Sequence, residues 1–245
     1  MRARVLVPEL MDDPALPRGD HLLALRGLAR LNRLSAAAPQ MWRTIRPLAR
    51  VLASTNGSVQ MLDVATGSGD VPLRLALLAR SDANPVRLDP TLCDSSPTAL
   101  EAAMERAERL GVSGVSTRVA DVVADGLPFP DAFFPVVTCS LFLHHLERHA
   151  CVALLREMAR VVKPRGVLVV SDLRRCTAGL VAAATAGHLL TRSRIVHVDA
   201  VRSVRAAWTP VELASIAAEA GLSDPQRLRI ARVWPWRMLL RWEAP

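Results

Sequence analysis

The segment of the sequence that most clearly indicates a chemical function is a short loop of small residues that contains Gly67 and Gly69. The apolar run Val59–Val64 before this loop predicts a buried strand, and the run Val71–Arg80 after it has the spacing of a helix. A strand, a tight glycine turn and a helix allow the backbone to approach a nucleotide-like ligand closely. Asp63 precedes the loop, where its carboxylate can accept hydrogen bonds from a ligand's ammonium group.

The loop differs from a dinucleotide-binding fingerprint, because Pro72 stands where that fingerprint has its third glycine. The order acid-x-small-x-Gly-x-Gly, from Asp63 to Gly69, instead resembles motif I of the class I S-adenosylmethionine-dependent methyltransferases. The residues of this loop are most similar to those of the ubiquinone/menaquinone-biosynthesis branch, whose acceptors are small molecules. The resemblance implies a Rossmann-like α/β fold: a seven-stranded, mostly parallel sheet with a C-terminal antiparallel pair and helices on both faces. It also implies a methyltransferase with S-adenosyl-L-methionine as cofactor.

The same resemblance assigns cofactor contacts to the carboxyl ends of successive strands. Asp94, after the second strand, would accept both ribose hydroxyls, and Asp121, after the third, would bind the adenine amino group with Val122 against the ring. The alternatives are a helix cap for Asp94 and a solvated loop carboxylate for Asp121. The complete predicted cofactor set is Arg43, Asp63, Ala65, Thr66, Gly67, Ser68, Gly69, Asp94, Ser95, Asp121, Val122 and Ser140.

Two further segments carry the resemblance. Arg43, next to Trp42, matches a basic residue that meets the methionine carboxylate, although an exposed helix face would explain it equally well. The stretch Ser140–Leu146 resembles the apolar-His-His-Leu segment that lies beside the cofactor. His145 in this stretch is either a base or substrate contact, or else a residue that caps the next helix or satisfies a core hydrogen bond.

The predicted catalytic residues are His145, His197 and Asp172. A phenol has a pKa of about 10, so its methylation needs a group that removes the proton, and a neutral histidine can do so. Asp172 ends the fifth predicted strand on the ligand-binding side of a parallel sheet, where it would orient a histidine or the acceptor. His197 lies in a late segment that resembles small-molecule methyltransferases of phenolic polyketide pathways, and a surface loop is the alternative.

Composition limits the classes of partner. The net charge of +8 comes from 31 basic residues of which Lys163 is the only lysine, and they are spread along the chain with only 4% aromatic residues. A nucleic-acid surface needs clustered positive charge with interleaved aromatics. The Asn/Asp-Pro-Pro-aromatic motif of base-methylating enzymes is also missing after the fourth strand. We therefore expect a small aromatic or lipid-like acceptor of phenol or quinol type, methylated on oxygen or carbon, and no nucleic acid.

The four cysteines show no metal-ligand spacing, so we expect reduced thiols, no metal site and a cytoplasmic protein. Peripheral membrane contact and the oligomeric state stay open. An NAD(P)-dependent oxidoreductase and a catalytically silent cofactor-binding partner protein are the alternative functions.

The predicted organisation is an N-terminal helical extension, residues 1–55, followed by a cofactor-binding domain, residues 56–245. An insertion at about 173–208 would form a substrate lid. It is expected to hold an apolar helix at 178–190 and a charged loop at 192–205. The other predicted elements are helices at 21–34, 40–53, 69–80, 98–110, 148–162 and 210–220, strands at 59–64, 86–93, 115–120, 133–140 and 167–171, and two strands within 227–242.

Overall fold

A seven-stranded sheet with the order β3-β2-β1-β4-β5-β7-β6 forms the centre of the computed structural model, which describes residues 3–12, 15–190 and 193–245. The first five strands pair in parallel, and β7 pairs antiparallel with both β5 and β6. The predicted fold class is therefore confirmed. The strands are β1 (Val59–Val64), β2 (Leu88–Asp94), β3 (Ser116–Val119), β4 (Phe134–Ser140), β5 (Val162–Leu173), β6 (Leu228–Val233) and β7 (Arg237–Glu243).

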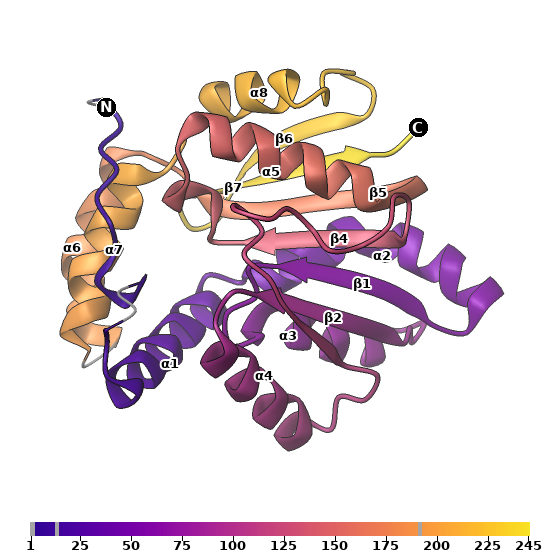
Figure 1. The fold of residues 1–245 in the computed structure, drawn as a ribbon, viewed down its shortest axis with the longest axis horizontal. Coiled ribbons are helices and arrows are strands. Elements are labelled where there is room, and N and C mark those ends of the chain that lie inside the picture. Colours follow the sequence, from indigo (N-terminus) through magenta and orange to yellow (C-terminus); the bar gives the residue numbers. More distant parts are fainter. Residues whose placement is uncertain (1–2, 13–14, 191–192) are drawn as a thin grey trace.

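Helices cover both faces of this sheet (Figure 1). One buried cluster joins α2 and α3 to the sheet and includes Met41, Ile45 and Leu75, while a second joins α5 and α8 to the opposite face. The helices are α1 (Arg18–Leu34), α2 (Ala37–Asn56), α3 (Asp70–Arg80), α4 (Pro97–Leu110), α5 (Arg148–Val161), α6 (Thr177–Leu190), α7 (Arg194–Ala206) and α8 (Pro210–Glu219), with short 3-10 turns η1 (Leu10–Asp12) and η2 (Leu143–His145).

Two details depart from the sequence-based expectations. The segment predicted as a charged loop at 192–205 contains the helix α7, whose Ser193 hydroxyl caps it and whose Val196 and Val204 are buried. Strand β2 accommodates Pro90, which pairs with Met61 of β1. Pairing with β3 begins only at Thr91, so the missing N–H of proline lies beyond the end of the β2–β3 ladder.

The carboxyl ends of the parallel strands point toward α1, α6 and α7, which lie together at one end of the sheet (Figure 1). The N-terminal residues 4–11, which we call the strap, run along α7. Within the strap, the backbone N–H groups of Leu10 and Met11 donate to the carboxylate of Asp199, and Arg202 donates to the carbonyl of Pro8. The strap is thereby fixed over the edge of the sheet where ligands bind in this architecture.

The described helices include none with the length and apolar character that crossing a membrane requires.

Candidate active site

The glycine loop between β1 and α3 has the backbone conformation that its sequence predicts. Gly67 and Gly69 have φ angles of 54° and 66°, in the left-handed region that favours glycine. A side chain on Gly69 would begin 3.0 Å from Cβ of Ala103, so this glycine allows α3 to pack closely against α4. A Cβ on Gly67 would meet only Leu25, at 3.9 Å, and both residues line a large cavity next to the loop. Of the two glycines, Gly67 lines the cavity and Gly69 does not.

Asp94 and Asp121 lie where the sequence predicts them, after β2 and β3, and both line the same cavity as the loop. Asp94 accepts the backbone N–H of Gly67 at 2.7 Å and that of Ser96 at 2.9 Å. Asp121 accepts two backbone N–H groups of its own loop, and Val122 beside it is buried.

The cavity has a volume of about 1030 Å³, at the upper end of the range for ligand pockets. Its lining runs from the glycine loop, across the ends of β2, β3 and β4, to the strap, α1, α6, α7 and the turn before β7. Trp234 and Trp236 of this turn contribute apolar surface. The predicted cofactor residues among the lining are Ala65, Thr66, Gly67, Ser68, Asp94, Ser95, Asp121, Val122 and Ser140.

Asp63 does not reach the cavity lining. It is buried beneath the loop and accepts the hydroxyl of Thr138 at 2.5 Å. Burial raises the pKa of its carboxyl to about 7, although the hydrogen bond from Thr138 acts in the opposite direction. Asp70, at the start of α3, does line the cavity, and burial raises its pKa as well.

Arg43, the predicted partner of a carboxylate, is exposed on α2 and is not among the described residues that line the cavity. Arg237 lines it instead, with only 2% of its surface exposed. Its guanidinium donates to Asn32 at 3.0 Å and to Ser35 at 2.7 Å, while its Nε is buried without a hydrogen bond. Burial lowers the pKa of Arg237 to about 10, against the opposing charges of Asp172 and Asp70, so the side chain remains cationic at neutral pH. No pattern in the sequence singles out Arg237, which lies in the C-terminal strand pair.

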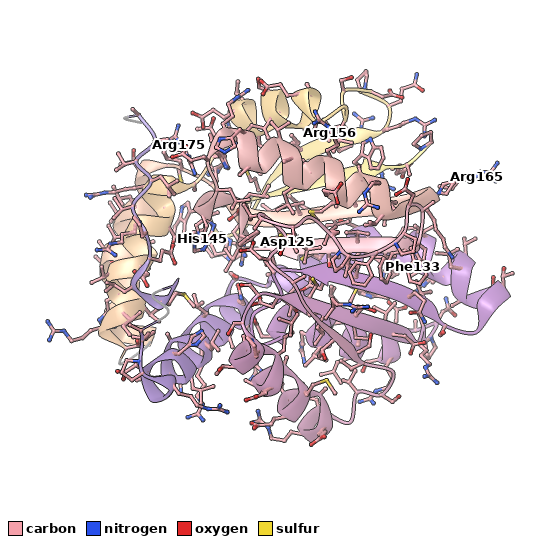
Figure 2. The ribbon with its side chains drawn as sticks, viewed as in Figure 1. Asp125, Phe133, His145, Arg156, Arg165 and Arg175 are labelled. Atoms are coloured by element: carbon pink, nitrogen blue, oxygen red, sulfur yellow. The ribbon has the colours of Figure 1, made fainter. Side chains whose placement is uncertain are left out.

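Two adjacent histidines and two carboxylates meet at the other end of the cavity. Asp172 holds His144 twice, through its backbone N–H at 3.0 Å and its ring Nδ1 at 2.7 Å. Glu9 of the strap faces both rings, 3.5 Å from Nε2 of His144 and 3.8 Å from Nε2 of His145. Figure 2 shows His145 between the sheet and the α6–α7 pair. Asp172 therefore does orient a histidine, as predicted, but this histidine is His144 and not one of the two predicted catalytic histidines.

The charges in this cluster depend on one another. Burial lowers the pKa of His144, but the charge and hydrogen bond of Asp172, together with the charge of Glu9, outweigh burial and raise the pKa to about 10. In turn, although burial opposes it, His144 keeps the pKa of Asp172 below its usual value. His144 is therefore an imidazolium between two carboxylates at neutral pH, whereas His145 is the partly exposed ring that faces the cavity.

His197 lies on α7, half-buried, and is not among the described residues that line the cavity. The geometry gives it no access to an acceptor there, so it is dropped from the candidate catalytic set. Asp199, two residues later, does line the cavity and anchors the strap that delivers Glu9.

Residues 61–166, which contain the glycine loop, Asp94, Asp121 and the histidine pair, match a family described as a methyltransferase domain. Over this region the chain is therefore similar to methyltransferase domains, as the glycine loop predicts. It is similar to the ubiquinone/menaquinone biosynthesis C-methyltransferases UbiE of Azotobacter vinelandii and Pseudomonas fluorescens. The Azotobacter protein is 30% identical over 58% of this chain and 52% of its own length. The Pseudomonas protein is 28% identical over 73% of this chain and 65% of its own length. The chain thus spans about half to two thirds of these relatives' length.

Solved methyltransferase structures share the fold. An S-adenosylmethionine-dependent methyltransferase from Aquifex aeolicus has a TM-score of 0.55 and 17% identity, over 83% of this chain and 98% of that protein. An O-methyltransferase family 2 protein from Planctomyces limnophilus, solved with apigenin, has a TM-score of 0.64 and 20% identity. The match covers 95% of this chain and 63% of that protein.

The residues present fit the cofactor of this family. The loop at Gly67 is open to the cavity, and the carboxylate of Asp94, a group that suits a ribose diol, lines it too. Asp70 and the cation of Arg237 line the same cavity, and their opposite charges suit the ammonium and carboxylate of an amino-acid group. S-adenosylmethionine is therefore the cofactor that this site suits.

Proposed function

We propose that this protein transfers the methyl group of S-adenosylmethionine to a small aromatic or lipid-like acceptor of phenol or quinol type, on oxygen or on a ring carbon. One observation carries the proposal: a single cavity joins the glycine loop and its carboxylates to an apolar compartment that contains the two histidines. Similarity to quinone-biosynthesis C-methyltransferases and to an O-methyltransferase solved with apigenin supports the acceptor class.

Residues at the methionine end would bind and orient the cofactor. Asp94 would take the ribose hydroxyls, Asp121 and Val122 the adenine, and Arg237 the carboxylate through a charge-assisted contact. The bound cofactor supplies an electrophilic methyl group on a sulfonium. The protein must then hold the acceptor atom about 3 Å from that carbon and in line with the bond that breaks.

The acceptor compartment would exclude water and manage the acceptor's proton. Apolar side chains of α1, α6 and α7 and the tryptophans of the turn before β7 form its walls, including Leu25, Ala182, Val204 and Trp236. His144 already carries a proton, so His145 is the side chain we assign to take the hydroxyl proton as the new bond forms. Residues 173–208 and the N-terminal helices would act as the lid over this compartment.

Two measurements test the proposal in sequence. Calorimetry with the full chain should show one equivalent of S-adenosylhomocysteine bound and no uptake of NADPH. Mass spectrometry should then find methyl transfer to at least one member of a panel of phenols, alkylphenols and quinols, and none to tRNA or DNA. Failure of folded protein to bind S-adenosylhomocysteine would overturn the proposal, and binding without transfer across the panel would favour a silent cofactor-binding partner.

A further inference from the structure

We propose that Glu9, His144 and His145 form a binding site for one divalent transition-metal ion, of the Zn²⁺ or Co²⁺ type, at the acceptor end of the cavity. The three side chains each offer one ligand atom, and all three atoms lie within 4.8 Å of one another. Among the described residues, no other group of histidine, cysteine and acidic side chains has this arrangement. Two imidazoles and one carboxylate are a donor set that suits such ions.

The distances favour a shared ion over direct hydrogen bonds. The Glu9 oxygens lie 3.5 Å from Nε2 of His144 and 3.8 Å from Nε2 of His145. Good N–H···O hydrogen bonds are shorter, at about 2.7–3.2 Å. Two ligands that bind one ion tetrahedrally, each at about 2.1 Å, lie about 3.4 Å apart. The observed separations, each to a different oxygen of Glu9, are close to this spacing, so small side-chain shifts would bring both rings and the carboxylate onto one ion.

The surroundings of His144 match those of a metal ligand. Its Nδ1 is held by Asp172 at 2.7 Å, which leaves Nε2 directed toward Glu9 and the cavity. Histidine ligands commonly use their second nitrogen in this way, because the carboxylate fixes the tautomer and strengthens the ligand. Both His144 and Asp172 are nearly fully buried, at 3% and 1% exposure, so the ring is held in a fixed orientation.

Glu9 reaches this position only because the strap is anchored. Asp199 accepts the two N–H groups that follow Glu9, and the hydroxyl of Ser203 donates to the Glu9 carboxylate. A dication at this position would be balanced by the carboxylate of Glu9 and, through the ring of His144, by that of Asp172. Because the three ligands line the cavity, one coordination position would face it, which is the pattern of catalytic metal sites.

The ion would also suit the proposed methyl transfer, on which this site does not depend. As a Lewis acid it would bind the acceptor's oxygen and lower the pKa of its hydroxyl, with His145 serving as a ligand and not as the proton acceptor.

Metal binding can be measured with the metal alone. Full-length protein freed of metal with a chelator would be titrated with Zn²⁺ by calorimetry and with Co²⁺ by absorption spectroscopy. We expect one ion per chain and a spectrum of nitrogen and oxygen ligands without thiolate charge transfer. Glu9→Gln and His145→Ala should each weaken binding at least 10-fold, and Asp172→Asn about 10- to 100-fold through His144.

His21→Ala is the matched control, because His21 lines the same cavity outside the cluster, and it should leave the affinity unchanged. Circular dichroism of each variant separates loss of binding from loss of fold, and Glu9→Gln preserves the shape of the side chain where Asp172→Asn disturbs the core. Absence of stoichiometric binding by folded wild-type protein would overturn the site. Wild-type metal affinity in both Glu9→Gln and His145→Ala, or the absorption bands of thiolate ligands, would also overturn it. Methyl transfer and S-adenosylhomocysteine binding are measured separately, so failure of the metal site is distinguishable from failure of the proposed function.

Discussion

The two ends of the cavity are built in different ways. The nucleotide end is local: the loop, Asp94 and Asp121 each follow directly on a strand of the parallel sheet. The acceptor end is assembled from distant segments, since Glu9 comes from the strap, the histidine pair from η2 and Asp172 from the end of β5. The parallel sheet thus positions the first end by itself, whereas the second also needs the N-terminal strap.

The largest expected effect tests whether the two ends are separable. His145→Gln should lower the rate of methyl transfer by about 100- to 10,000-fold, because it removes either the proton acceptor or a ligand of the ion. The affinity for S-adenosylhomocysteine should stay within about twofold, since His145 lies at the acceptor end. Rates come from mass spectrometry with an acceptor from the panel and affinities from calorimetry, with exposed His149→Gln as the control. A parallel loss of affinity would contradict the separation.

The second prediction concerns the buried carboxyl beneath the loop. Burial raises the pKa of Asp63 to about 7, so between about pH 4 and pH 7 the folded state keeps a proton that the unfolded state has released. The free energy of unfolding should therefore fall as pH rises through this window and level off above it. Relative to Asp63→Asn, wild-type protein should lose on the order of 4 kcal/mol, since one pKa unit corresponds to about 1.4 kcal/mol.

Urea unfolding of both proteins at pH 5 and pH 8 should show about 3 kcal/mol of this loss, because about two pKa units separate pH 5 from the folded-state pKa of about 7. Other titrating groups are common to the two proteins and cancel in the comparison. If the pH dependence were the same in both, Asp63 would be ionised in the folded protein throughout.

The third prediction probes the nucleotide end alone. Asp94→Asn should weaken binding of S-adenosylhomocysteine about 100-fold, because two hydrogen bonds to a charged acceptor are reduced. The change keeps the size of the side chain, and the backbone N–H of Gly67 retains an oxygen acceptor. Calorimetry gives the affinity, and exposed Asp125→Asn is the control. Unaltered affinity would leave Asp94 only as a residue that orders the loop and caps the helix.

The difference between the ends also explains what the sequence could predict. Gly67 was identified from its strand, turn and helix, and Asp94 and Asp121 from the family resemblance and their places after predicted strands. The structure puts all three on one cavity. Glu9 and Arg237 carry no such local pattern, since one lies in an irregular N-terminal segment and the other in the C-terminal antiparallel pair. Only the tertiary fold brings them to the cavity.

Two other expectations failed for physical reasons. The helix α7 was predicted as a loop because its arginines obscure the amphipathic spacing of Val196 and Val204, which are buried. Arg43 was chosen by its neighbourhood to Trp42, but successive residues on a helix point in different directions. Trp42 is buried, and Arg43 faces the solvent.

The smallest expected effect decides which arginine meets the methionine carboxylate. Arg237→Gln should weaken binding of S-adenosylhomocysteine about 10-fold, since one charge-assisted contact is lost, and Arg43→Gln should leave it unchanged. Methylthioadenosine, which lacks the amino-acid part, should bind wild-type protein and Arg237→Gln equally well. Loss of affinity for both ligands would instead indicate that Arg237 supports the cavity through Asn32 and Ser35. If only Arg43→Gln lowered the affinity for S-adenosylhomocysteine, Arg43 would be the partner of the methionine carboxylate, as the sequence first suggested.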